Sequence, residues 1–359
     1  MKVTIAGGGN IGTQFAVHFA EKQHEVTVYT STPELYDGQI NIVDDAGNIR
    51  HEGKIAKATD DPEIAFKEAE VVIVTMPATM MSTIAATIQK YLNPSAVIGL
   101  VPGSGGGECA FRNSIEKGNI LFGIERVPAI ARLVQKGKSV RSIGYRNELH
   151  VAAIPRSAAE KCAEMIEDVF EIPVKIIPNY LNLTMTPSNP ILHTSRLKTM
   201  FDGWHSGVWY DRVPLFYEDW NDAASEVLFA CDEEVQKICR DIKDIDLSYV
   251  KSLKDHYESY TVESMTKKIS GIPAFAGLKT PMIKEANGYI PDLHSRYFTA
   301  DFSYGLCIIK QIGEFAGTST PQIDAVLEWY KSIAIEHERF SFSDYGIGDY
   351  SSLMAFYNR

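Results

Sequence analysis

The first thirty residues constrain the fold of this 359-residue chain more than any other stretch. An apolar run at Val3–Ala6 leads directly into the sequence GGGNIG at 7–12. A helical pattern follows from Thr13 to about Gln23, and a second β-rich run covers Val26–Tyr29. The order strand, Gly-x-Gly-x-x-Gly, helix, strand within so few residues is typical of a Rossmann-type dinucleotide-binding unit.

The three motif glycines have separate physical roles. Gly7 allows a sharp turn at the end of the strand, Gly9 leaves room for a pyrophosphate, and Gly12 lets the helix pack closely against the strand. Asn10 and Ile11 lie within the motif, just before a helix whose free N–H groups and positive dipole end attract phosphate. All five are candidate cofactor-binding residues. The alternative is a glycine-rich turn that binds nothing, and the flanking elements argue against it.

The end of the second strand bears on the choice of nicotinamide cofactor. NAD-preferring versions of this fold place an Asp or Glu there to hold the ribose 2′-hydroxyl. This chain has Thr30 and Ser31 instead, with no acid before Glu34. Hydroxyl side chains can accept a 2′-phosphate, although no arginine follows at once. We therefore name Thr30 and Ser31 as candidate cofactor contacts. They slightly favour NADP as the cofactor, and NAD is the alternative.

Composition excludes several classes of protein. A formal net charge of -11 argues against a nucleic-acid partner. No apolar run approaches the roughly 18 residues of a membrane span, and the N-terminus does not resemble a signal peptide. The five cysteines are scattered without metal-like spacing. We expect a cytoplasmic protein with reduced cysteines, no metal site and no membrane association.

The pattern continues as an interrupted βαβ series. The following elements are predicted: an antiparallel hairpin at 39–58, helices at 62–69, 80–91, 109–117 and 158–170, strands at 70–77, 96–101, 120–125 and 173–177, and a hairpin at 139–154. Strand ends face the ligand crevice in such sheets, which makes Pro77 a candidate cofactor contact. A second glycine cluster, PGSGGG at 102–107, follows another strand end. It is either a flexible loop or a place where Ser104 approaches the substrate.

Composition changes after Ile177, where alternating β-like runs give way to helical spacing. We therefore predict two domains: an α/β Rossmann-type domain at 1–178 and a mostly α-helical domain at 179–359.

Three residues of the second half are chemical candidates. Asn189 has the residue type of an N-cap and Pro190 fits the first helical position, so a helix is predicted from there to a C-cap at Gly203, with His193 in its first turn. A lone histidine is more often packed than catalytic. Arg296 and Asp301 lie five residues apart among aromatic residues. That spacing fits a structural ion pair or, alternatively, an arginine that clamps a carboxylate beside an acid that orients a base.

Several segments together resemble the opine dehydrogenases of the octopine, nopaline and N-(1-carboxyethyl)-norvaline type. These segments are GGGNIG, PGSGGGECAFR, NPILH, IPAFAGLKTP, SRYFTADFSYGL and STPQIDAVLEWY. The resemblance spans nearly the whole chain, and its NPILH and RYFTAD parts are the more specific ones. It implies a helical domain like the C-terminal domain of 6-phosphogluconate dehydrogenase.

The resemblance also implies a reaction and site residues. An α-keto acid and the amino group of an amino acid would form an imine, which NAD(P)H would reduce. We expect the keto acid to be pyruvate. His193 would be the acid/base, Asp301 its partner, and Arg296 the ligand of the keto-acid carboxylate. Arg132 keeps the arginine of a family Cys-Arg pair whose cysteine is missing here. The missing acid after the second strand is another departure.

Three questions stay open at this stage. The aromatic and acidic segment 201–220 is either packing, including a homodimer contact, or a pocket wall that favours a cationic amino acid. A ketopantoate- or glycerol-phosphate-type reductase shares the Rossmann half but does not account for NPILH and RYFTAD. A non-catalytic dinucleotide sensor would bind cofactor without turnover.

Overall fold

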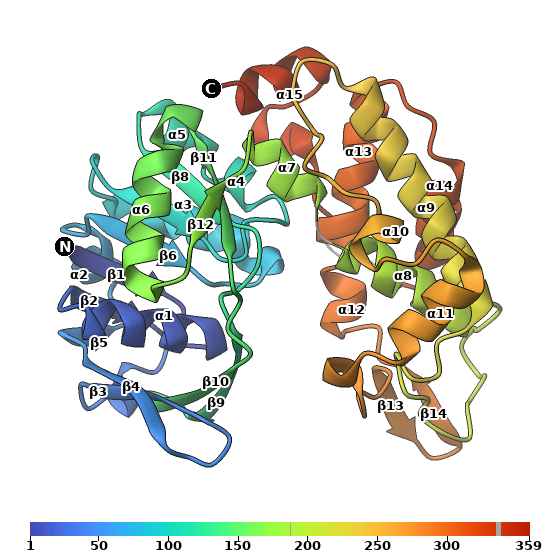
Figure 1. The fold of residues 1–359 in the computed structure, drawn as a ribbon, viewed down its shortest axis with the longest axis horizontal. Coiled ribbons are helices and arrows are strands. Elements are labelled where there is room, and N and C mark those ends of the chain that lie inside the picture. Colours follow the sequence, from blue (N-terminus) through green and yellow to red (C-terminus); the bar gives the residue numbers. More distant parts are fainter. Residues whose placement is uncertain (187, 335–338) are drawn as a thin grey trace. The chain divides into compact units, whose positions relative to one another are not determined.

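The computed structural model describes residues 1–186, 188–334 and 339–359 (Figure 1). The chain divides into two compact units, the first formed by Met1–Thr184 with Ala355–Arg359 and the second by Met185–Met354. The domain boundary predicted at 178–179 falls a few residues before this division. Within the described residues, no helix combines the length and the hydropathy needed to cross a membrane.

An eight-stranded sheet forms the centre of the first unit, in the order β12-β11-β8-β7-β6-β1-β2-β5. Its strands are β1 (Lys2–Ala6), β2 (Glu25–Tyr29), β5 (Lys57–Thr59), β6 (Val71–Val74), β7 (Val97–Leu100), β8 (Ile120–Ile124), β11 (Leu149–Ile154) and β12 (Val174–Ile176). The run from β5 to β8 is parallel and has the strand order of a Rossmann fold, so the order reverses between β1 and β6. The Rossmann prediction is confirmed.

Helices cover the sheet and fill the connections of the first unit. They are α1 (Asn10–Glu21), α2 (Pro62–Phe66), α3 (Met81–Tyr91), α4 (Gly107–Ala110), α5 (Arg112–Glu116), α6 (Ala159–Phe170) and α7 (Tyr180–Met185), with 3₁₀ turns η1 (Pro33–Leu35), η2 (Ala78–Met80) and η3 (Arg156–Ala158). The single helix predicted at 109–117 is wrong, because Phe111 leaves helical geometry and separates α4 from α5.

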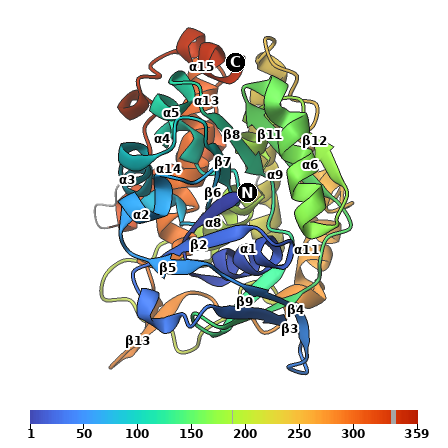
Figure 2. The same cartoon turned by 90° about the vertical axis from the view of Figure 1, so that its left-hand side faces the viewer.

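A second sheet of four strands, β4-β3-β10-β9, packs on α1 (Figure 2). Its strands are β3 (Gln39–Val43), β4 (Ile49–Lys54), β9 (Ile130–Gln135) and β10 (Ser139–Ile143). The hairpin predicted at 39–58 is confirmed as β3–β4. The hairpin predicted at 139–154 is wrong: β10 pairs with β9 and β3, whereas β11 joins the main sheet beside β8. As a result α1 is buried on every side from Gly12 to Ala20, rather than on one face.

The second unit is mostly helical. Its helices are α8 (Asn189–Met200), α9 (Asp222–Asp241), α10 (Leu253–His256), α11 (Val262–Ser270), α12 (Arg296–Thr299), α13 (Cys307–Phe315) and α14 (Pro321–Ile333), with 3₁₀ turns η4 (Pro273–Phe275) and η6 (Phe342–Tyr345) and a π-helical turn η5 (Phe302–Leu306). The last helix, α15 (Tyr350–Tyr357), begins in the second unit and ends in the first, which includes Ala355–Arg359. The hairpin β13–β14 (Met282–Glu285, Gly288–Pro291) was not foreseen, and the expectation that β structure ends at Ile177 is wrong in this respect.

Two predicted helix ends also differ from the structure. Asn189 is the first helical residue of α8 and Ser188 precedes it as the cap, so His193 lies one turn into the helix. The helix ends at Met200, before Gly203, because the chain turns at Phe201. Residues 201–221 form a loop without a helix, in which Gly203 and Gly207 have positive φ angles of 74° and 95°.

Candidate active site and dinucleotide-binding loop

The glycine motif after β1 has the geometry of a phosphate-binding loop. Gly7 has a φ of 125°, which residues with a side chain rarely adopt. A Cβ atom on Gly12 would lie 1.7 Å from the carbonyl oxygen of Gly7, so only glycine allows α1 this close to the strand end. A Cβ on Gly9 would meet nothing within 4 Å. The loop is therefore closed towards the protein and open at Gly9, as a bound pyrophosphate requires.

The start of α1 leaves its N–H groups available. Gly9 is the cap residue, no side chain caps the helix, and no acidic residue lies in its first turn. The first N–H groups of a helix lack partners within the helix and favour an anion. The Asn10 side-chain oxygen accepts a hydrogen bond from the Leu133 N–H (2.7 Å), while Ile11 is half-buried against the core. These residues fit the phosphates of a dinucleotide.

Two kinds of side chain lie near the end of β2. Hydroxyl groups there attract a 2′-phosphate, whereas the carboxylate of Asp60, after the neighbouring strand β5, repels it. The hydroxyl oxygens of Thr30 and Thr32 lie 3.4 Å apart, and Ser31 is exposed. The Thr30 N–H donates to the carbonyl of Thr59 at the end of β5, so Asp60 follows next to this site. Asp60 contributes to raising the pKa of Tyr29, after the larger effect of burial.

The second glycine cluster is packed rather than loose. A Cβ on Gly103 would lie 2.7 Å from the Cα of Gly123, and the Tyr180 hydroxyl donates to the Gly103 carbonyl at 2.9 Å. Ser104 is half-buried, whereas Pro77 is exposed. Beyond the cluster, the fully buried Glu108 accepts hydrogen bonds from the hydroxyls of Thr184 (2.6 Å) and Tyr357 (2.7 Å), and burial raises its pKa.

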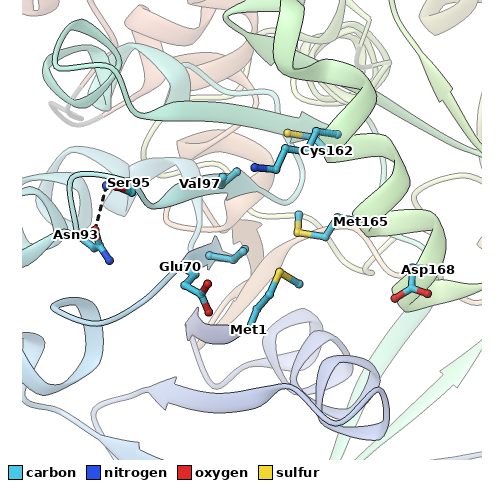
Figure 3. Close-up of a pocket in the computed structure, with 10 residues that line it drawn as sticks. Met1, Glu70, Asn93, Ser95, Val97, Cys162, Met165 and Asp168 are labelled. Carbon is cyan, nitrogen blue, oxygen red and sulfur yellow. Dashed lines mark hydrogen bonds between the residues drawn. The ribbon is translucent and has the colours of Figure 1, made fainter.

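A pocket of about 280 Å³ lies at the opposite edge of the same sheet (Figure 3). Met1, Val71 and Val97 stand at the amino ends of their parallel strands, and Cys162 and Met165 reach it from α6. Dinucleotides bind at the carboxyl ends of the strands in this fold. The pocket is therefore separate from the glycine loop.

The chemically richest cluster of the second unit surrounds His193 on α8. His193 Nδ1 lies 2.7 Å from a carboxylate oxygen of Asp301, and Nε2 lies 2.7 Å from the Tyr217 hydroxyl. The histidine is 7% exposed, and the rings of Tyr297 (4.5 Å between centroids) and Phe216 (5.5 Å) pack on it. Both ring nitrogens are thus engaged inside an aromatic pocket.

Close packing between α8 and η5 brings Asp301 to His193. Asp301 directly precedes the π-helical turn, in which the Leu306 N–H donates to the Asp301 carbonyl five residues back. A Cβ on Gly305 would lie 2.6 Å from Pro190 at the start of α8, so glycine permits this approach. π-Helical turns are frequent at functional sites.

The contact between Tyr217 and His193 could not be predicted from the sequence. Arg196, one turn beyond His193, is buried and donates to the carbonyls of Phe216 (3.1 Å) and Asp219 (2.5 Å). Burial lowers the pKa of Arg196 to about 10. The arginine thereby holds the loop that carries Tyr217. An aromatic residue in the segment 201–220 was the only available signal.

The structure places the two predicted substrate arginines in different units. Arg296 begins α12 next to Tyr297 and is exposed; within the described ranges its guanidinium forms no ion pair or hydrogen bond. Asp301 pairs with His193 instead, so the two residues do not form the alternative structural ion pair. Arg132 lies on β9 in the first unit, exposed, and donates to the Ala131 carbonyl at 3.0 Å.

Fold and site define a two-part dehydrogenase: a Rossmann-type half with a phosphate loop and a helical half with a histidine–aspartate pair. Residues 176–334 match the family model described as NAD/NADP octopine/nopaline dehydrogenase, alpha-helical domain, and residues 3–154 match that of ketopantoate reductase PanE/ApbA. The helical half of the chain is thus similar to the octopine and nopaline dehydrogenases.

Individual relatives agree over nearly the full length. The chain is 29% identical to the uncharacterized protein y4xO of Sinorhizobium fredii (92% of this chain, 94% of the relative) and 24% identical to the tauropine dehydrogenase of Arabella iricolor (92% and 91%). Among solved structures, an octopine dehydrogenase with NADH and L-arginine superposes with a TM-score of 0.87 at 22% identity (99% and 98% covered).

Proposed function

We propose that this protein is an NAD(P)H-dependent opine dehydrogenase. A keto acid and an amine condense to an imine with loss of water, and the imine takes up a hydride and a proton to give a secondary-amine dicarboxylate. The observation that carries the proposal is the hydrogen bond between His193 and Asp301, residues from the two most family-specific segments. Curated relatives named tauropine dehydrogenase and octopine dehydrogenase support it.

His193 is the acid/base group in this proposal. A carboxylate at Nδ1 stabilises the tautomer with hydrogen on Nδ1, which leaves the Nε2 lone pair to take or return a proton. Protonation at Nε2 gives an imidazolium that Asp301 stabilises. That proton then passes to the keto oxygen as water leaves. The Tyr217 hydroxyl, 2.7 Å from Nε2, occupies the position through which such a proton travels.

Arg296 binds the carboxylate of the keto acid. Its guanidinium is exposed and offers the two-pronged donor geometry that suits a carboxylate. We expect Arg296→Gln to raise KM for the keto acid about tenfold to hundredfold, because a hydrogen bond to a charged group contributes roughly 1.5–3 kcal/mol. The paired surface residue Arg240 provides the control: Arg240→Gln should leave KM unchanged. An unchanged KM in Arg296→Gln would contradict this role.

In this proposal residues 1–178 hold the cofactor, and residues 179–359 carry the acid/base His193 and the carboxylate ligand Arg296. When bound, the dinucleotide supplies the hydride. Gly7, Gly9 and Gly12 shape the loop, while the N–H groups at Asn10 and Ile11 face its phosphates. Ser104 and Arg132 contact substrate, and Pro77 contacts cofactor. NADH and NADPH must be compared directly, because the hydroxyls of Thr30 and Ser31 favour a 2′-phosphate whereas Asp60 repels it.

We propose that the acidic residues of segment 201–220 do not select the amino substrate. Three of its carboxylates have structural partners: Asp202 pairs with Lys198, Glu218 accepts from the Gly277 N–H, and Asp219 accepts from the Leu215 N–H. The preference for a cationic amino acid therefore loses most of its basis.

The deciding experiment follows the loss of NADPH and NADH absorbance with pyruvate and a panel of amino acids. Oxidation that needs both substrates supports the opine reaction, and the faster cofactor tests the lean towards NADP. Oxidation with a keto acid alone would indicate the ketopantoate-type reductase that matches residues 3–154. Tight cofactor binding without turnover for any pair would favour the sensor. A cytoplasmic location and a homodimer complete the proposal, with cell fractionation and solution mass as their tests.

A further inference from the structure

Two histidines and a glutamate meet on the side of α1 that faces the four-stranded sheet. His18 and Glu21 lie one turn apart on α1, and His51 reaches them from β4. His51 Nδ1 lies 2.9 Å from a Glu21 carboxylate oxygen, and His18 Nδ1 lies 4.0 Å from the same oxygen. One donor atom from each residue falls within 4.8 Å of the other two. The three donors converge on one point.

These donors suit one class of metal ion. Two imidazoles and one carboxylate match Zn²⁺ and related divalent transition metals, whereas Ca²⁺ and Mg²⁺ prefer oxygen ligands. Metal–ligand bonds of about 2.0–2.1 Å in a tetrahedron place donors about 3.3 Å apart. The observed 2.9 Å and 4.0 Å lie on either side of this value. Small side-chain rotations would therefore complete the site.

The surroundings prepare His18 as a ligand. Its Nε2 lies 3.0 Å from the Tyr145 hydroxyl, so a hydrogen bond at Nε2 orients the ring with Nδ1 towards Glu21. Metal-ligating histidines characteristically have such a partner on the second nitrogen. Burial, with smaller effects of His51 and Lys22, lowers the pKa of His18 to about 3.

The neighbouring charges do not block the cluster. Lys22 is the nearest cation on α1, and it is paired with Glu171 at 2.6 Å. The Phe170 ring closes one side of His18, with ring centroids 4.6 Å apart. His51 and Glu21 remain about one-third exposed (34% and 37%), which gives an ion a path from solvent and room for a water ligand.

We propose that His18, Glu21 and His51 form a binding site for a divalent transition-metal ion of the Zn²⁺ type. The three ligands make no recognisable motif in the sequence, because His51 on β4 lies thirty or more residues from His18 and Glu21 on α1. A bound ion would join β4 to α1, the helix whose first turn faces the cofactor phosphates. The site is therefore structural and separate from the chemistry at His193.

The test is Zn²⁺ titration of tag-free, chelator-treated protein by calorimetry. We expect one Zn²⁺ per chain and a higher thermal unfolding midpoint, because a ligand that binds only the folded state stabilises it. His51→Gln should lower the affinity at least a hundredfold. Tyr145→Phe should lower it about tenfold, as outer-shell changes do. Mg²⁺ and Ca²⁺ should not compete.

The control is His205→Gln, which removes an exposed histidine of the second unit and should leave Zn²⁺ binding unchanged. Circular dichroism in chelator verifies that each variant is folded, and Glu21→Gln replaces His51→Gln if the latter unfolds. The visible spectrum of bound Co²⁺ should report tetrahedral nitrogen and oxygen ligation. No binding by the wild type at micromolar Zn²⁺, or equal affinity in the His51 and Glu21 variants, overturns the proposal.

Discussion

The phosphate loop and the His193 centre are built in opposite ways. The loop is six consecutive residues whose decisive contact, Gly12 against Gly7, is local. The centre is assembled from Asp301, which is 108 positions from His193, and Tyr217, which is 24 positions away. Local backbone sterics determine the first. Packing of α8 on η5 and of a loop on Arg196 determines the second.

This difference governs what a substitution should disturb. At Gly12 of the loop, a single added methyl group collides with backbone that cannot move aside. In the His193 centre, side chains can be removed while the helices that carry them stay packed. We therefore expect binding and stability effects in the loop, and turnover effects at His193.

The largest expected effect belongs to His193→Ala. Loss of a general acid/base typically lowers kcat about 10²- to 10⁴-fold, and NAD(P)H binding should stay unchanged because the loop lies in the other unit. Stopped-flow turnover and fluorescence titration of NAD(P)H measure the two quantities. His205→Ala, at an exposed histidine of the same unit, is the control. Unchanged turnover would remove His193 from the mechanism, and weakened cofactor binding would break the proposed separation.

Gly12→Ala and Gly9→Ala should separate the two functions of the loop. At Gly12 the Cβ would lie 1.7 Å from a backbone oxygen, so we expect a stability loss of about 3 kcal/mol together with weak NAD(P)H binding. At Gly9 the Cβ meets nothing, and the backbone is extended, so stability should hold while a methyl group displaces the pyrophosphate. Urea unfolding and fluorescence titration check both. Equal stability of the two variants would show that the Gly7–Gly12 contact is not tight.

The contrast between local and long-range contacts also explains which features could be predicted from the sequence. The Rossmann half was recognised because apolar runs and glycines report local geometry directly. The hairpin at 139–154 was wrong because its two strands look alike in sequence while β10 and β11 pair in different sheets. At the site, His193, Arg296 and Asp301 were assigned through resemblance to a family. Tyr217 and Arg196 carry no local signal, since their roles depend on a loop folding back onto α8.

Tyr217→Phe tests whether the Tyr217 hydroxyl takes part in proton transfer beside the His193–Asp301 pair. The change removes the hydroxyl at Nε2 but keeps the ring stacked on Phe275, 4.1 Å between centroids. If the hydroxyl passes the proton, kcat should fall about tenfold, which equals roughly 1.4 kcal/mol, and the pH profile of kcat should change shape. Tyr289→Phe, on the hairpin β14, is the control. A normal kcat and pH profile would reduce Tyr217 to a packing residue.

The smallest effect is expected from the conservative change Glu108→Gln, at a residue that combines both kinds of construction. Glu108 follows the second glycine cluster directly, yet its hydrogen-bond partners Thr184 and Tyr357 lie 76 and 249 positions away. Burial raises its pKa above the ordinary 4.5. Between the two pKa values the folded state keeps a proton that the unfolded state releases, so the contribution of Glu108 to stability is fully present below pH 4.5 and is lost as pH rises through the folded-state pKa.

Glu108→Gln keeps the acceptor oxygen but cannot titrate. Below pH 4.5 its stability should lie within about 1.5 kcal/mol of the wild type, as for other near-isosteric changes, and above that pH it should not decline with the wild type. Glu108→Ala leaves both hydroxyls unpaired and should cost about 1–3 kcal/mol at every pH. Urea unfolding across the pH range measures all three proteins. Parallel curves for wild type and Glu108→Gln would mean that Glu108 is ionised in the fold, and its anchoring of Tyr357 would then be a charged interaction rather than a neutral one.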